Sequence, residues 1–139
     1  MTLIGRLHPL LVHFPIAFAL AAAGAEAAGL VTADESWSVM ARRAVRAAAP
    51  CALVAAIAGW RLAIDAGSDH PALLQWHRWL GTSAAGATVA AAIAASVLNR
   101  RHPLAVWIYR SALLVAAALV GITGHLGGVL AWGADFLHF

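Results

Sequence analysis

The stretch from about Leu104 to His125 has the sequence LAVWIYRSALLVAAALVGITGH and decides the fold class. Its length matches the roughly 20 residues that an α-helix needs to cross the hydrocarbon core of a bilayer. The stretch is rich in alanine, leucine and valine, and it lacks the period-2 alternation of a membrane β-strand. Three further stretches share these properties: about Leu10–Val31, Ala44–Ile64 and Trp76–Leu98. The sequence therefore predicts four transmembrane helices.

The overall composition leads to the same fold class. Of the 139 residues, 63% are hydrophobic and 11% are charged, and the mean hydropathy is +0.82. A soluble domain is about half apolar and about a quarter charged, so the surface of this chain must face lipid. The four stretches and their short connections use nearly the whole chain. We therefore expect one domain over residues 1–139, an all-α integral membrane four-helix bundle with antiparallel neighbours.

The arginines indicate how the bundle is oriented. The chain has nine basic residues, all arginine, and a sequence pI near 10.5. Six of them lie in or beside the first and third connections: Arg42, Arg43, Arg46, Arg100, Arg101 and Arg110. The opposite side has three: Arg6, Arg61 and Arg78. Because basic residues concentrate on the cytoplasmic side, we expect both termini on the periplasmic side of a bacterial inner membrane. No Gly-rich phosphate loop or finger pattern supports nucleic-acid binding.

Histidines gather at the predicted outer end of the bundle. His13, His77 and His125 belong to the first, third and fourth predicted helices. The third helix rises about 33 Å at about 1.5 Å per residue, and the other two cover similar distances. We therefore expect these three imidazoles to lie at one depth, just inside the outer boundary. His8 lies five residues before His13, and Pro9 and Pro15 disturb the helical phase, so the sequence leaves open which of the two histidines faces the interior.

Glycines adjoin two of these histidines. Gly81 lies one helical turn after His77, and Gly124 and Gly128 flank His125. Small residues let two helix backbones approach closely. They leave room equally well for the edge of a flat macrocycle, so the glycines are consistent with both interpretations.

Imidazole is a common ligand of haem iron, zinc and copper. The chain has no C-x-x-C-H motif, which excludes covalently attached c-type haem, so a haem here would be b-type with ligands from these four histidines. Arg61 and Arg78 lie at the level where they would pair with its propionates. Two alternatives remain open. One is a metal ion held by His13, His77 and His125, and the other is a cluster that is structural or handles protons.

Glu26 is predicted to lie within the first helix, near its inner end. A carboxylate inside the membrane is a candidate functional group by default. The simpler interpretation is an ion pair with Arg46 or Arg110 on a neighbouring helix.

Several motifs together resemble a known family. They are HPLLVHFPIA at residues 8–17, Gly59-Trp60, HRWLG at residues 77–81 and GHLGG at residues 124–128. The chain resembles, over essentially its whole length, a family of bacterial four-helix membrane proteins catalogued as domain of unknown function number twenty-two thirty-one. Related domains are fused in some bacteria to cytochrome c or Rieske-type modules. The resemblance therefore implies a redox setting on the outer face of the membrane.

Our leading hypothesis is a b-type cytochrome-like membrane subunit rather than a stand-alone enzyme. It would pass electrons between the quinone pool and an outer-face carrier or dehydrogenase, and one of its histidines would have a quinone as hydrogen-bond partner. The first alternative is a non-catalytic accessory subunit of a larger redox or pigment-containing membrane complex. The second is a metal-ion-binding protein of the outer face.

Overall fold

The computed structural model describes residues 3–66, 69–99 and 101–133, and this part of the chain is helical without any strand. Two one-turn helices, α1 (Leu3–Arg6) and α2 (His8–Leu11), precede four long ones. The long helices are α3 (His13–Thr32), α4 (Glu35–Ala66), α5 (Pro71–Val97) and α6 (Pro103–Trp132). Four helices are long and apolar enough to cross a membrane. The prediction of an all-α chain with four such helices is confirmed.

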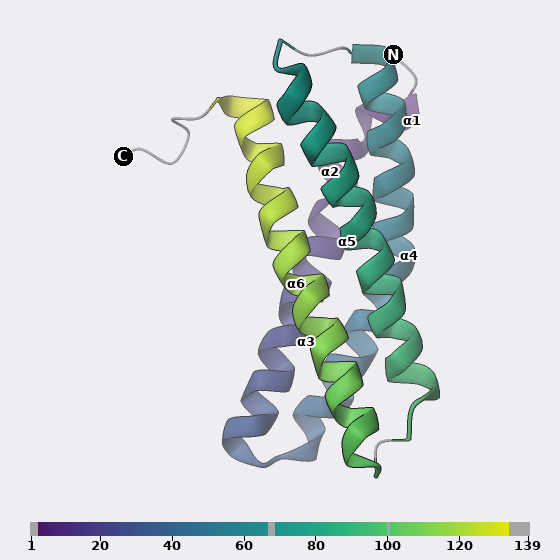
Figure 1. Ribbon diagram of the computed structural model, residues 1–139, viewed down its shortest axis with the longest axis vertical. Helices are drawn as coiled ribbons and strands as arrows, with labels where there is room; N and C mark the ends of the chain where they lie inside the picture. Colours follow the sequence, from purple (N-terminus) through teal and green to yellow (C-terminus); the bar gives the residue numbers. More distant parts are fainter. Residues whose placement is uncertain (1–2, 67–68, 100, 134–139) are drawn as a thin grey trace.

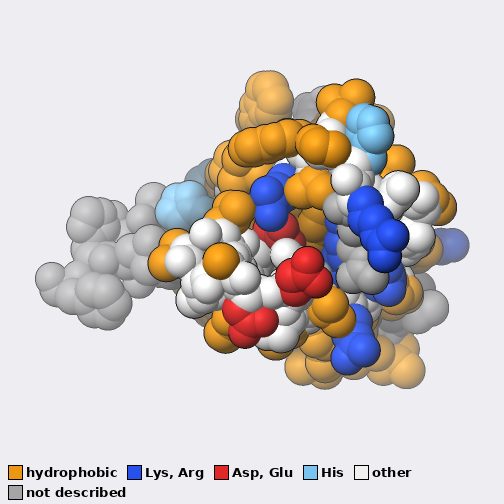
Figure 2. Space-filling view, turned by 90° about the horizontal axis from the view of Figure 1, so that it is seen from below, with side chains coloured by type: hydrophobic (Ala, Val, Ile, Leu, Met, Phe, Trp, Pro, Cys, Tyr) orange, Lys and Arg blue, Asp and Glu red, His pale blue; other side chains and the backbone are white. Residues whose placement is uncertain are grey.

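Figure 1 shows the four long helices side by side, with consecutive helices running in opposite directions. We call the end where α4 and α6 finish and α5 begins the histidine end, because His8 and His77 lie there. The other end, where α3 and α5 finish, is the arginine end. Figure 2 looks onto the arginine end and shows basic and acidic side chains gathered on it. The chain termini themselves, residues 1–2 and 134–139, lie outside the described residues, as does Arg100.

The connection between α3 and α4 is shorter than the sequence indicated. It consists of Ala33, whose φ of 54° is left-handed, and Asp34. The Oδ1 atom of Asp34 accepts a hydrogen bond of 2.8 Å from the Ser36 backbone N–H, which caps the start of α4. Arg42 and Arg43 therefore lie within α4 and not in a connection, which corrects the predicted start of this helix at Ala44.

The other long helices also differ from their predicted bounds. α6 continues through the run of glycines to Trp132, so these residues do not end the helix at His125. The first predicted helix is divided into α2 and α3 at Val12. Proline has no N–H, so Pro15 cannot donate to the carbonyl of Leu11, and the helical hydrogen-bond pattern is interrupted there.

The interior of the bundle is lined mainly by alanine. α3 packs against α4 and α6, and α5 packs against the same two helices. The larger apolar side chains buried between them are Val45, Tyr109, Leu113 and Val120. Large apolar side chains such as Leu114, on α6, are exposed instead. This distribution suits helices that approach closely in the interior and face lipid outside.

Candidate functional site: the His8–His77 pair

The structure brings His8 of α2 against His77 of α5 at the histidine end. Their ring centroids lie 6.3 Å apart, and the ring planes meet edge to face at 77°. Both side chains are half-buried. The sequence left open whether His8 or His13 faces the interior, and the structure places His8 there.

Each imidazole is held by a backbone carbonyl of a further helix. His8 Nδ1 donates to the Ala55 carbonyl of α4 at 3.0 Å, and His77 Nδ1 donates to the Thr123 carbonyl of α6 at 3.1 Å. These bonds assign the proton of each neutral ring to Nδ1, so each Nε2 keeps its lone pair. A ring fixed in this way has the arrangement typical of metal-ligating histidines, in which the second nitrogen donates to a carbonyl.

Two glycines provide the space for the rings. A Cβ atom at Gly59 would lie 2.8 Å from His8 Cε1, and one at Gly127 would lie 3.0 Å from His77 Cε1. Any larger residue at either position would force the adjacent imidazole to move. The sequence placed Gly59 in a family motif, but its role against His8 becomes apparent only in the structure.

The expected convergence of His13, His77 and His125 is not found. His13 and His125 are both exposed, and the described residues include no group of three or more His, Cys, Asp or Glu side chains that could hold a metal ion. His13 follows the break at Val12, and its side chain does not face the interior of the bundle. Depth follows from counting residues, whereas the direction of a side chain depends on the local helical phase.

The sequence left the glycines near His77 and His125 open between contact with a macrocycle and close helix packing, and in the structure they take part in packing. A Cβ at Gly81 would lie 3.3 Å from Thr123 Cγ2, and a Cβ at Gly124 would lie 3.4 Å from Ile16 Cδ1. Gly128 is buried within α6. These residues serve close packing between helices.

Arg78 lies beside the histidine pair but binds an aromatic ring. Its Cζ atom is 3.9 Å from the ring centroid of Trp60, whose indole N–H donates to Thr82 Oγ1 at 2.9 Å. The Nε of Arg78 is buried and has no hydrogen-bond partner among the described residues. Arg61, the other arginine expected to contact a cofactor, is exposed.

A second polar cluster lies toward the arginine end. Arg110 Nε donates to Glu26 Oε1 at 2.7 Å, which confirms one of the two ion pairs that the sequence indicated. Ser38 Oγ donates to the same oxygen at 3.3 Å. The second carboxylate oxygen, Oε2, is buried without a hydrogen-bond partner in the described part of the chain, as is the hydroxyl of Tyr109.

Arg42 was missed as a member of this cluster because the sequence placed it in a connection. It is 4% exposed, its Nη1 donates to the Ala95 carbonyl at 3.0 Å, and its Cζ lies 4.2 Å from the ring centroid of Tyr109. Tyr109 is the single tyrosine of the chain and lies inside an apolar stretch. A polar aromatic residue at such a position was the signal in the sequence that pointed to a polar partner.

The comparisons with known proteins give one positive result. A family model described as "Predicted membrane protein (DUF2231)" matches residues 6–136. The chain belongs to this family. The resemblance based on the sequence motifs is thereby confirmed, and His8, Gly59, His77 and Gly127 all lie within the part of the chain that matches the DUF2231 model. No curated protein and no solved structure matched the chain.

Proposed function

We propose that this DUF2231 protein is an electron-transfer subunit of a bacterial inner membrane, in which His8 and His77 would hold a b-type haem. The observation that carries the proposal is the geometry of this pair: two half-buried imidazoles from different elements, each with Nδ1 bound to a carbonyl. This pair comprises two of the four histidines that the sequence offered as ligands, and it leaves out His13 and His125.

The proposal rests on the chemistry of the two donors. Imidazole is a common ligand of haem iron, and the two ring centroids lie 6.3 Å apart, so His8 and His77 would together hold one group. Haem iron with two such ligands supplies one-electron chemistry at a potential that burial and hydrogen bonds to the ligands adjust. The carbonyls of Ala55 and Thr123 would hold the rings in position throughout.

Arg78 is the residue best suited to pair with a carboxylate beside this centre. It directly follows His77 in α5, and its buried Nε has no acceptor among the described residues. The face of Trp60 holds its guanidinium in place at 3.9 Å, so the cation is already oriented before any anion binds.

The membrane orientation completes the proposal. The arginine end faces the cytoplasm by the positive-inside rule, which places the histidine end and both termini on the periplasmic side. An electron acceptor or donor would then be a periplasmic carrier, and the quinone pool of the membrane would be the other partner.

The test is a reduced-minus-oxidised absorption spectrum of the detergent-purified protein, produced with haem supplied during expression. We expect a b-type α-band that His8→Ala and His77→Ala abolish. His13→Ala and His125→Ala are matched controls, because each removes an imidazole that does not belong to the pair. Both variants should keep the α-band. A folded wild-type protein without the band would overturn the proposal, as would a band that depends on His125 and not on His8.

One observation favours a second candidate, the accessory subunit. A Cβ at Gly81 or Gly124 would contact Thr123 or Ile16 of a neighbouring helix, so these glycines contribute to helix packing. Under this hypothesis the histidine pair ties α2 and α5 to their neighbours, and the protein acts by packing against another membrane subunit. The protein would then give a featureless spectrum and migrate within a larger complex when native membranes are solubilised in mild detergent.

A further inference from the structure

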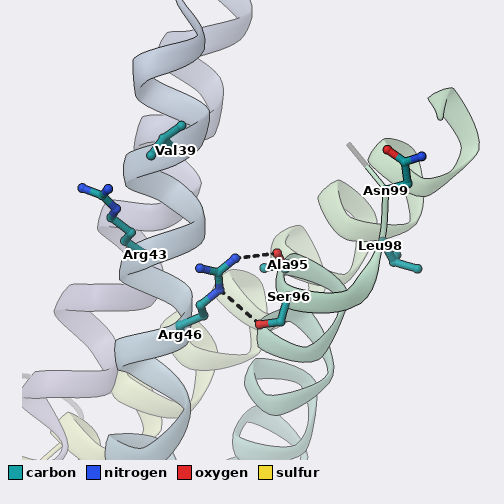
Figure 3. Close-up of a pocket in the computed structure, with 7 residues that line it drawn as sticks. All are labelled: Val39, Arg43, Arg46, Ala95, Ser96, Leu98 and Asn99. Carbon is teal, nitrogen blue, oxygen red and sulfur yellow. Dashed lines mark hydrogen bonds between the residues drawn. The ribbon is translucent and has the colours of Figure 1, made fainter. Parts of the chain in front are cut away.

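A cavity of about 470 Å³ opens at the arginine end, between α4 and the last turn of α5. Its polar lining consists of Arg43 and Arg46 from α4, Ser96 from α5, and Asn99 just beyond α5. Figure 3 shows Arg46 reaching across to α5 while Arg43 projects outward from α4. Among the described residues no acidic side chain lines the cavity, and its charged lining consists of two guanidinium groups.

Arg46 is partly occupied by the protein itself. Its Nη2 donates to the Ala95 carbonyl at 2.8 Å and its Nε donates to Ser96 Oγ at 3.1 Å. These contacts fix the guanidinium and satisfy a carbonyl near the end of α5. An arginine has five N–H donors, so the Nη1 donors of Arg46 remain for a ligand.

The structural role of Arg46 does not extend to Arg43. Arg43 is exposed, and no carboxylate lies within ion-pair distance of either arginine in the described part of the chain. The two cations are three residues apart on one helix, an arrangement that is unfavourable when nothing neutralises it. An anion in the cavity would reduce this repulsion, because it would accept charge-assisted hydrogen bonds from Arg46 and would be attracted by the positive charge of Arg43.

We propose that this cavity binds the phosphate of an anionic phospholipid headgroup. Three observations favour a lipid over a free anion. The volume is several times what one inorganic phosphate needs and lies in the range of pockets that hold larger ligands. Val39 and Leu98 add apolar lining. The cavity also lies at the end of four candidate membrane spans, where basic residues meet the negatively charged inner leaflet.

The test is native mass spectrometry of the detergent-purified full chain with phosphatidylglycerol or phosphatidylcholine of identical acyl chains. We expect tighter binding of phosphatidylglycerol, and a loss of about fivefold in that affinity for Arg43→Gln. Arg101→Gln is the matched control, because it removes the same charge from the same end outside the cavity, and it should change the affinity by less than about twofold. Arg43 is exposed, so its replacement should leave the circular dichroism spectrum unchanged.

Three results would overturn the proposal. Equal affinity for the two lipids would show that the headgroup charge is not recognised. Equal losses for Arg43→Gln and Arg101→Gln would show a general surface-charge effect. If inorganic phosphate displaced phosphatidylglycerol at a concentration below that of the lipid, the preferred ligand would be a free anion. None of these readouts depends on haem, so the lipid site and the histidine pair can fail independently.

Discussion

Gly59→Ala tests how tightly the bundle encloses His8. The added methyl group would lie 2.8 Å from His8 Cε1 and 3.1 Å from His8 Nδ1. The ring is held by its 3.0 Å bond to the Ala55 carbonyl, and the His77 ring lies next to it with the two centroids 6.3 Å apart. It therefore cannot turn away without losing that bond.

The expected cost follows from this geometry. Overpacking a close contact costs about 1–3 kcal/mol, and it includes the roughly 1 kcal/mol of a lost hydrogen bond. Alanine also favours a helix over glycine by about 1 kcal/mol, which offsets part of the cost. Gly86→Ala has the same propensity gain with nothing within 4 Å of the new Cβ. Gly59→Ala should therefore be about 1–3 kcal/mol less stable than Gly86→Ala.

The assay is equilibrium unfolding in mixed micelles by titration with a denaturing detergent, followed by circular dichroism. His8→Ala serves as a second background, because removing the ring removes the obstacle. In that background Gly59→Ala and Gly86→Ala should differ by less than about 0.5 kcal/mol. Equal stabilities of the two single variants in the wild-type background would refute the close packing of His8 against Gly59.

Three further predictions concern the polar groups toward the arginine end. Glu26→Ala should lower the free energy of unfolding by about 2 kcal/mol or more, because the Arg110 guanidinium loses its carboxylate; adding Arg110→Ala should then cost little further in the same assay. Tyr109→Phe should be neutral or slightly stabilising, since the buried hydroxyl has no partner among the described residues, and a loss above about 1 kcal/mol would reveal a partner. The pKa of Asp34 is lowered mainly by the hydrogen bond from the Ser36 backbone N–H and then by that from the Ser36 side chain. The cap therefore contributes to stability at pH values above the ordinary pKa of the carboxyl. This contribution is lost as the pH falls through the lowered pKa of the folded state. A carboxyl NMR titration should show that lowered midpoint, and Ser36→Ala, which keeps the backbone donor, should retain most of the shift.

The long apolar segments could be predicted because each carries its own signal in composition and length. Helix ends were less accessible. The start of α4 depends on the Asp34 cap and the left-handed Ala33, and the polar first turns of this helix, with Arg42 and Arg43 in them, resemble a membrane-flanking connection in sequence. The Glu26–Arg110 pair could be anticipated because a carboxylate inside an apolar helix has few charged partners within reach.

The histidine pair was only partly predictable. Counting residues predicted several imidazoles at one depth, and His77 was one of the histidines that it named. The partner of His77 depended on which way the side chains of His8 and His13 point around the helix axis. Because Pro15 and the break at Val12 interrupt the helix, this direction could not be obtained by counting residues. The glycines were ambiguous in sequence, since the same lack of a side chain accommodates an imidazole at Gly127 and a threonine methyl at Gly81.

Because the interior consists mainly of alanine, substitutions there should act differently from substitutions in most protein cores. In an ordinary core, random substitution most often shortens a large side chain and leaves a hole. Here glycine is the only smaller replacement at most buried apolar positions, so nearly every substitution adds volume between helices that already touch. A deep mutational scan of the bundle should therefore rank interior variants by the size of the incoming residue, whereas hydrophobicity should rank the variants on the outer faces of the same helices.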